Sequence, residues 1–148
     1  MVKVSAQQCS QDFKEENFNF GDHRINKRAK KVIDSISNGL GKSLPGIFSD
    51  QADLQGVYRF LNNDLVTPEK ILQPHIELTV ERCKGQDVVA VIQDSSDLSF
   101  DYLGEVDGFN PLQSHIDNGF RIHPSLAING TGVPLGVLGA HNYTREEK

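Results

Sequence analysis

An aspartate directly after an apolar segment is the first residue in this chain that could do chemistry. The segment VVAVIQDSSDLSF, residues 88–100, places Asp94 after five apolar residues and one glutamine. Such a β-branched run, apolar on both faces, predicts a central strand of a sheet. A carboxylate held at the end of a rigid strand can bind a hard cation such as Mg²⁺, or it can hold the following turn through its own side chain. On these residues alone, the turn is the favoured role of Asp94.

A run of cations, RINKRAKK at residues 24–31, is the second group with chemical potential. Four of them recur at i, i+3, i+4 and i+7, so a helix would place them on one face. This set, here named the basic stripe, consists of Arg24, Lys27, Arg28 and Lys31. Like charges at this spacing repel by a few tenths of a kcal/mol per pair, about 0.2–0.5, unless an anion lies beside them. The stripe predicts either a solvated cationic face, which charge alone favours, or a phosphate-binding surface.

Helices are the elements that must carry the stripe and its neighbours. The stretch from Asp22 to Gly39 has a capping aspartate, apolar residues at helical spacing and an Asn-Gly stop. A second helix is expected within residues 50–64, with Leu54, Val57, Tyr58 and Leu61 on its core face. A third is expected at 67–84, where Thr67 precedes Pro68, with a kink or restart at Pro74.

A loop rich in Gly, Ser and Pro joins the first two helices and contains Gly41, Lys42 and Ser43. The tripeptide suggests a nucleotide phosphate loop, but that motif needs a glycine where Ile36 stands and a strand before the loop rather than a helix. We therefore reject a nucleotide site here.

Strand-like sequence replaces helix-like sequence after Gly85. The segment IHPSLAINGTGVPLGVLGAHNY, residues 122–143, predicts two strands joined by the turn NGTG, and residues 101–119 predict a long loop. The sequence thus indicates an α+β chain, with a helical part at residues 1–85 and the start of a sheet at residues 86–148.

Composition limits the classes of protein to consider. The chain has 148 residues, a net charge of −5 and two distant cysteines. It has no apolar run of the roughly 18 residues that a spanning helix needs and no signal-like start. We expect a cytoplasmic protein without membrane partners, disulfide framework or zinc site.

The ordered motifs FGDHRINKRAKK, GKS, GVYRFLNN and VIQDSSDLSF, followed by GFRIHPSLAINGTGVPLGVLGAHNY, extend over most of the chain. Together they resemble the amino-terminal part of bacterial cut-and-paste transposases of the insertion-sequence-four family. The resemblance implies a small helical domain that binds double-stranded transposon-end DNA, residues 1–85. It also implies the first strands of a ribonuclease-H-like catalytic domain, incomplete in residues 86–148.

Asp94 matches the first of three catalytic carboxylates, Asp, Asp and Glu, which in that family bind Mg²⁺ or Mn²⁺ for phosphodiester cleavage and strand transfer. Two metals shared by three carboxylates can activate a nucleophile and stabilise the leaving oxygen. The matching segment departs slightly from the family pattern, with Ser95 and Ser96 where threonines are common and Asp97 expected on the loop side.

The chain ends at Lys148, before the elements that carry the second Asp and the Glu. We therefore expect it to be inactive alone and not to bind metal tightly. Further acids and histidines follow Asp94 without helical or strand spacing toward it, and we do not expect them to supply a substitute site. They are Asp101, Glu105, Asp107, His115, Asp117 and His123.

The resemblance also assigns DNA contacts. Arg24 and Arg28 match basic positions of the family's first helix, Lys42 and Ser43 match its GKS loop, and Arg59 matches the arginine of its YRF motif. We expect the basic stripe to contact phosphates, and Arg59 or the loop to read a base edge. Tyr58 and Phe60 are expected to pack rather than to stack on bases.

Two functions of different classes are consistent with this sequence. The chain could be a transposase fragment that binds end DNA without cutting it, or a non-catalytic repressor or dominant-negative inhibitor that blocks a full-length copy. For either function, the expected protein partner is a second copy of the chain in a homodimer, or full-length transposase in a heterodimer. A decayed reading frame that folds poorly is a third possibility, because unpaired strand edges promote aggregation.

Overall fold

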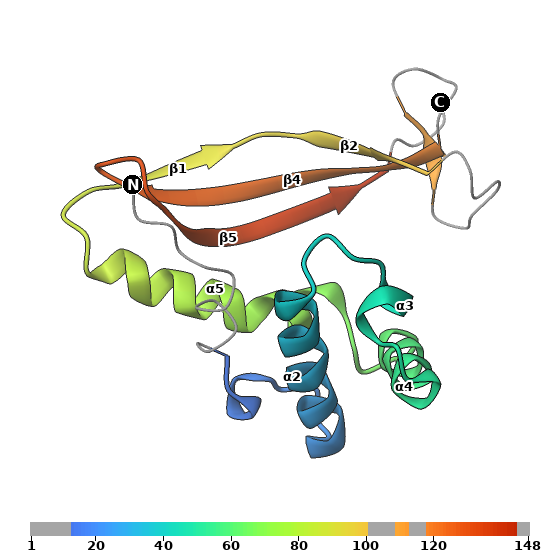
Figure 1. Ribbon diagram of the computed structural model, residues 1–148. Helices are drawn as coiled ribbons and strands as arrows, with labels where there is room; N and C mark the ends of the chain where they lie inside the picture. The colour runs from blue at the N-terminus through green and yellow to red at the C-terminus, as the bar shows by residue number, and fades with distance from the viewer. Residues whose placement is uncertain (1–12, 101–108, 113–117, 145–148) are drawn as a thin grey trace. The chain divides into compact units, whose positions relative to one another are not determined.

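The computed structural model of the chain describes residues 13–100, 109–112 and 118–144. These residues form helices and an antiparallel sheet, which confirms the α+β class (Figure 1). The chain divides into two compact units, unit 1 at Met1–Leu78 and unit 2 at Thr79–Lys148. The division falls inside a helix rather than at the change of sequence character near Gly85. No described helix has both the length and the apolarity needed to cross a membrane.

Unit 1 consists of short helices around an aromatic core. A 3-10 turn, η1 (Glu15–Asn17), precedes α2 (His23–Asn38), α3 (Leu44–Ile47), α4 (Gln51–Leu61) and the first part of α5 (Pro68–Lys84). The core is built by residues that are almost fully buried: Phe18, Phe20, Ala29, Val32, Phe48, Leu54, Val57 and Phe60. Phe20 packs edge-on against Phe60, with ring centroids 5.7 Å apart. Burial of this apolar surface holds α2 against α4.

Each helix of unit 1 begins where a side chain satisfies its first free N–H groups. Asp22 accepts a hydrogen bond from the backbone N–H of Arg24, Ser43 from that of Gly46, and Asp50 from that of Asp53. The expected start and end of α2 are confirmed, since the helix runs from the residue after Asp22 to the residue before Gly39. α5 continues through Pro74 as one helix rather than restarting there.

The expected core face of α4 is partly wrong. Leu54 and Val57 are buried as predicted, but Tyr58 and Leu61 are exposed and Phe60 is buried in their place. Phe60 follows the same helical spacing from Val57 by three positions, and its ring fills the space beside Phe20. The aromatic contact therefore decides which face of the helix is covered.

Unit 2 is a sheet in which one long strand pairs with all the other described strands. β4 (Asn118–Asn129) has β1 (Val89–Gln93) and β2 (Ser96–Ser99) along one edge and β3 (Asn110–Pro111) and β5 (Pro134–Tyr143) along the other. All of these pairs are antiparallel. The two strands predicted on either side of the NGTG turn are β4 and β5.

Three details of the sheet differ from the expectation. β1 lies at an edge of the described sheet rather than at its centre, because β4 takes the central place and Val91 and Ile92 stay about half exposed, at 51% and 49%. The segment after Asp94 forms β2 instead of a loop. β4 begins at Asn118, before the predicted start at residue 122, and extends into the predicted loop region that also holds β3.

Aromatic packing explains why β2 forms and why β4 starts early. Phe100 stacks on Phe109 and Phe120, with ring centroids 5.1 and 5.9 Å apart. Asp97 of β2 forms an ion pair with Arg121 of β4, and the Arg121 Nη2–Asp97 Oδ2 hydrogen bond is 3.0 Å long. These cross-strand contacts outweigh the weak strand preference of Ser and Asp.

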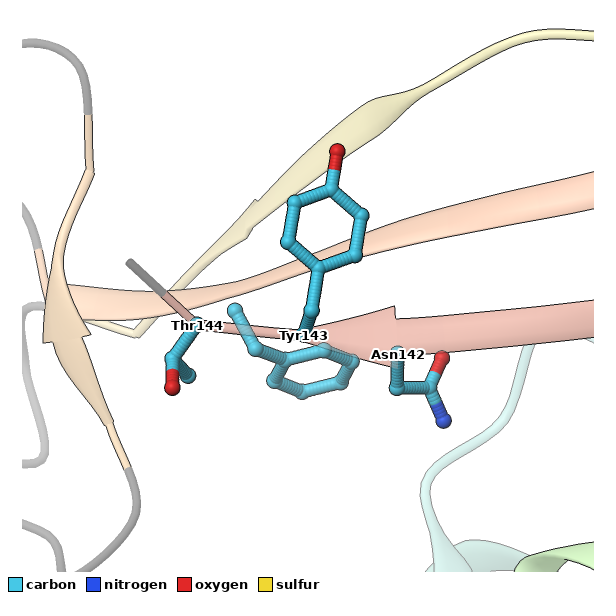
Figure 2. Close-up of a pocket in the computed structure, with 4 residues that line it drawn as sticks. Asn142, Tyr143 and Thr144 are labelled. Carbon is cyan, nitrogen blue, oxygen red and sulfur yellow. The ribbon is translucent and has the colours of Figure 1, made fainter. Parts of the chain in front are cut away.

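The last residues of α5 belong to unit 2 and pack on β5. Thr79 is fully buried against Gly136, whose φ of +144° and contact with the Thr79 side chain leave no room for a Cβ. The Arg82 Nη1 group donates to the carbonyl of Leu135 at 3.1 Å. A small hollow of about 340 Å³ lies at the end of β5, between Phe120, Asn142, Tyr143 and Thr144. Figure 2 shows Tyr143 and Asn142 projecting to opposite sides of β5, as strand alternation requires.

Candidate DNA-binding surface

Unit 1 places three arginines around one cavity between α2 and α4. The cavity has a volume of about 520 Å³ and is open to solvent. Arg24 and Arg28 reach it from α2, and Arg59 reaches it from α4. The remaining lining residues are Asp22, Ile25, Gly56, Phe60, Asn63 and Leu65. A concave site with three guanidinium groups suits an anionic ligand such as a phosphate.

The basic stripe is not bare, because carboxylates of the same unit neutralise three of its four members. Arg24 donates from Nη2 to Asp22 Oδ2 at 2.9 Å. Asp53 of α4 accepts from Lys31 Nζ at 2.5 Å and lies 3.6 Å from Arg28 Nη1. Asp22 and Asp53 therefore supply part of the negative charge that relieves repulsion among the cations of the stripe.

These pairs shift the acids in the expected direction. Hydrogen bonds from the Arg24 side chain and backbone lower the pKa of Asp22 to about 2. The hydrogen bond from Lys31, followed by the charges of Lys31 and Arg28, lowers the pKa of Asp53. Both carboxyl groups are solvent-accessible, so solvent screens the pairs and their main effect is to orient the cations.

Of the predicted-site cations carried by α2 and α4, two are left without an ion pair among the described residues. They are Lys27 on α2 and Arg59 on α4, and both side chains are exposed. Lys27 belongs to the basic stripe, whereas Arg59 lies at the cavity. Free, exposed cations are suited to phosphate contacts because a long side chain can follow the backbone of a duplex.

The GKS loop lies outside the lining of the arginine cavity. Ser43 caps the four-residue helix α3 through its side chain, and Lys42 is exposed just before it. Their role in DNA binding stays a prediction.

Asp94 lies in the gap between β1 and β2, where the edge of the sheet is interrupted. Its Oδ1 atom accepts from the backbone N–H of Ser95 at 2.8 Å, and the Ser95 hydroxyl lies 2.7 Å from His123 Nδ1 on β4. His123 lies within β4, in the segment predicted as a strand from residue 122. The other acids and the histidine considered after Asp94 lie outside the described residues.

The described residues do not form a complete metal site around Asp94. No group of three or more His, Cys, Asp or Glu side chains able to hold a metal ion occurs in the described part of the chain. One exposed carboxylate supplies too few ligands for the two-metal arrangement that the resemblance implies.

Sequence reasoning missed the residues that organise the cavity. Asp53 and Gly56 belong to α4, 22 or more positions after the last residue of the stripe. The helical spacing of residues in α2 therefore does not predict where they lie. Asp53 could have been suggested by the sequence because it is an acidic residue on the same predicted helix as Arg59. Gly56 is an unusual residue for a helix interior, which is itself a sign of a close approach.

Comparison with known families supports a DNA-binding role for this unit. Residues 10–66 match the family model described as transposase DNA-binding. The match contains the whole basic stripe, the GKS loop, Asp53, Gly56 and Arg59. It supports a transposase amino-terminal region with DNA as its partner. A search of curated proteins found no match.

Proposed function

We propose that this chain is the amino-terminal part of a transposase of the insertion-sequence-four family, of which the transposon-five transposase is the best-known member. In this proposal unit 1 binds double-stranded DNA at the transposon ends. The observation that carries it is the arginine cavity and basic stripe inside the segment that matches transposase DNA-binding domains. The chain as a whole is acidic, with a net charge of −5, so its attraction to DNA depends on this local cluster of cations.

The proposed contacts divide into two kinds. The exposed, unpaired Lys27 and Arg59 contact phosphates directly. When DNA binds, Arg24 and Lys31 exchange part of their contact with Asp22 and Asp53 for contact with phosphate, and counterions are displaced from the duplex. Affinity then falls with rising salt concentration.

We extend the proposal to unit 2 as the start of a ribonuclease-H-like catalytic domain, with Asp94 as its first carboxylate. Its support is the position of Asp94 at the end of β1 and the resemblance of the surrounding segment. In the family enzymes Mg²⁺ or Mn²⁺ supplies the Lewis acid for phosphodiester cleavage. The described residues include no group of three or more ligand side chains that could hold such an ion, so we derive no catalytic step for them.

Selection of bound duplexes from a random DNA pool, with residues 1–148, tests the DNA-binding role. We expect one enriched sequence, and an affinity for it that falls with salt. Replacing both Arg24 and Lys27 with Ala should weaken binding to all duplexes and flatten the slope of log affinity against log salt by up to about 0.9 per lost phosphate contact.

Lys30→Ala provides the matched control on the same helix. Lys30 lies off the basic stripe and pairs with Asp34 through Nζ–Oδ2 at 2.5 Å. We expect this variant to keep the parent affinity and salt slope. Equal losses in both variants would mean that α2 acts through its overall charge, and absence of binding by the parent chain would overturn the proposed function.

A further inference from the structure

Arg28 is better covered by protein than the other two arginines at the cavity: its side chain is 36% exposed, against 80% for Arg24, and Arg59 is exposed. On one side the Arg28 guanidinium lies 3.6 Å from Asp53, a distance of ion pairing rather than hydrogen bonding, so its N–H groups keep their donor capacity. Asp53 is itself fixed by Lys31 at 2.5 Å. The carboxylate therefore orients Arg28 without using up its donors.

Gly56 restricts Arg28 from the other side. An ideal Cβ at position 56 would lie 2.7 Å from Nη1, 2.9 Å from Cζ and 3.1 Å from Nη2 of Arg28. The distance to Cζ falls between those to the two nitrogens, so the face of the guanidinium plane, rather than its edge, lies over the backbone of α4. This close approach is possible only because residue 56 has no side chain.

An arginine whose guanidinium plane is fixed by the protein and an arginine whose plane is free to rotate suit different kinds of DNA contact. Reading guanine requires two parallel N–H donors in the plane of the base, directed at O6 and N7. A pre-oriented arginine loses less conformational freedom when it makes this contact. The negative charge of Asp53 beside Arg28 also weakens attraction to the full negative charge of a phosphate more than attraction to the partial negative charges of a guanine edge.

We propose that Asp53 and Gly56 are positioning residues that hold the Arg28 guanidinium so that it reads a guanine edge in the bound duplex. This inference rests on the proposed function. It departs from the expectation drawn from sequence, which assigned base reading to Arg59 or to the GKS loop. Arg59, which has no ion pair in the described part of the chain, is then a phosphate contact.

Binding of the full chain to its selected duplex, and to a set with each base pair changed in turn, tests the proposal. Gly56→Ala should displace the end of the Arg28 side chain and reduce the preference for one G·C pair by about 10-fold or more, with an unchanged salt slope. Arg28→Lys keeps the charge but loses the planar fork, and it should reduce the preference at the same pair.

Asp53→Asn completes the set. It should lower the preference at that same base pair and raise affinity for random DNA, because a negative charge is removed from the stripe. Asp34→Asn is the matched control, since Asp34 pairs with Lys30 on the far side of α2 from the cavity lining, and it should leave the preference unchanged. Arg59→Lys should change affinity for every duplex by the same factor.

Retention of the full base preference in Gly56→Ala and Arg28→Lys would overturn the proposal. A measurement without DNA separates its failure from that of the proposed function. In the free chain, nitrogen-15 relaxation should report a rigid Arg28 guanidinium and a mobile Arg59, with Arg28 becoming mobile in Asp53→Asn. An Arg28 as mobile as Arg59 in the parent chain would overturn the positioning role even if DNA binding is strong.

Discussion

Acids of unit 1 control how its cations are presented. Asp22 caps α2 and binds the Arg24 side chain at the same time. Asp53 of α4 forms ion pairs with both Arg28 and Lys31 of α2. These three cations are therefore ordered before any ligand arrives. The basic stripe is better described as a set of oriented donors than as a uniform positive face.

Acid titration tests the role of Asp22. Its pKa is lowered from 3.8 to about 2 by Arg24, so the folded chain binds fewer protons there than the unfolded chain between these values. The ionised pair therefore stabilises the fold fully above about pH 4, and this contribution is lost as the pH falls toward 2. We expect the pH dependence of stability, followed by far-ultraviolet circular dichroism, to contain this component.

Asp22→Asn is the informative comparison because asparagine caps a helix about as well as aspartate. The variant should lose the pH-dependent component and keep the helix start. A difference between parent and variant that is equally large at pH 2 and pH 6 would contradict the assignment to the Asp22 charge.

Spacing within one helix was enough to predict the basic stripe, but not its partners. The recurrence at i, i+3, i+4 and i+7 correctly groups Arg24, Lys27, Arg28 and Lys31 on one face of α2. Asp53 and Gly56 could not be predicted, because their contacts with Arg28 depend on how α4 packs against α2. Tertiary contacts of this kind have no periodic signal in a single sequence.

At the scale of secondary structure, α4 connects the core to the cavity. Its buried side carries Leu54, Val57 and Phe60, and its cavity side carries Gly56 and Arg59. A change at the start of α4 should therefore affect both stability and DNA binding.

Asp50→Ala should destabilise unit 1 by about 1 kcal/mol, because it removes the carboxylate that accepts from the Asp53 backbone N–H at 2.9 Å. Urea unfolding followed by circular dichroism measures the change. Asp50→Asn should restore most of the stability. Equal losses in the two variants would mean that the charge, rather than the cap, stabilises the helix.

The helices were more predictable than the strands for a physical reason. Caps such as Asp22 and stops such as Gly39 act locally, so they can be identified in the sequence. β2 was missed because Ser96, Asp97 and Ser99 have weak strand preference and form a strand only where β4 supplies hydrogen bonds and Arg121 supplies an ion pair.

At the scale of the whole molecule, the two units differ in how much apolar surface they bury. Among the described residues, nearly all of the buried hydrophobic side chains belong to unit 1, whereas Val88, Val91 and Ile92 near the β1 edge are about half exposed or more. In the described sheet, β1 pairs with β4 alone, so its outer edge offers unpaired backbone groups beside apolar side chains. Such an edge favours association between chains.

Val91→Lys should reduce concentration-dependent association of the chain, because a lysine on an edge strand hinders pairing with a second strand. Light scattering across a range of protein concentrations measures the effect. Leu40→Lys is the matched control: Leu40 is exposed at 64% but follows α2 in unit 1, and none of the described strands belongs to that unit. An equal reduction in both variants would attribute association to exposed apolar surface in general.

The central position of β4 also has a consequence for synthesis of the protein on the ribosome. β1, β2 and β3 are all made before β4, yet in the described sheet each of them pairs only with β4. None of these strand pairs can form until residues 118–129 have left the exit tunnel. The helices of unit 1 have local hydrogen bonds and can form as they emerge, so the nascent chain acquires its helical half gradually and its sheet in one late step.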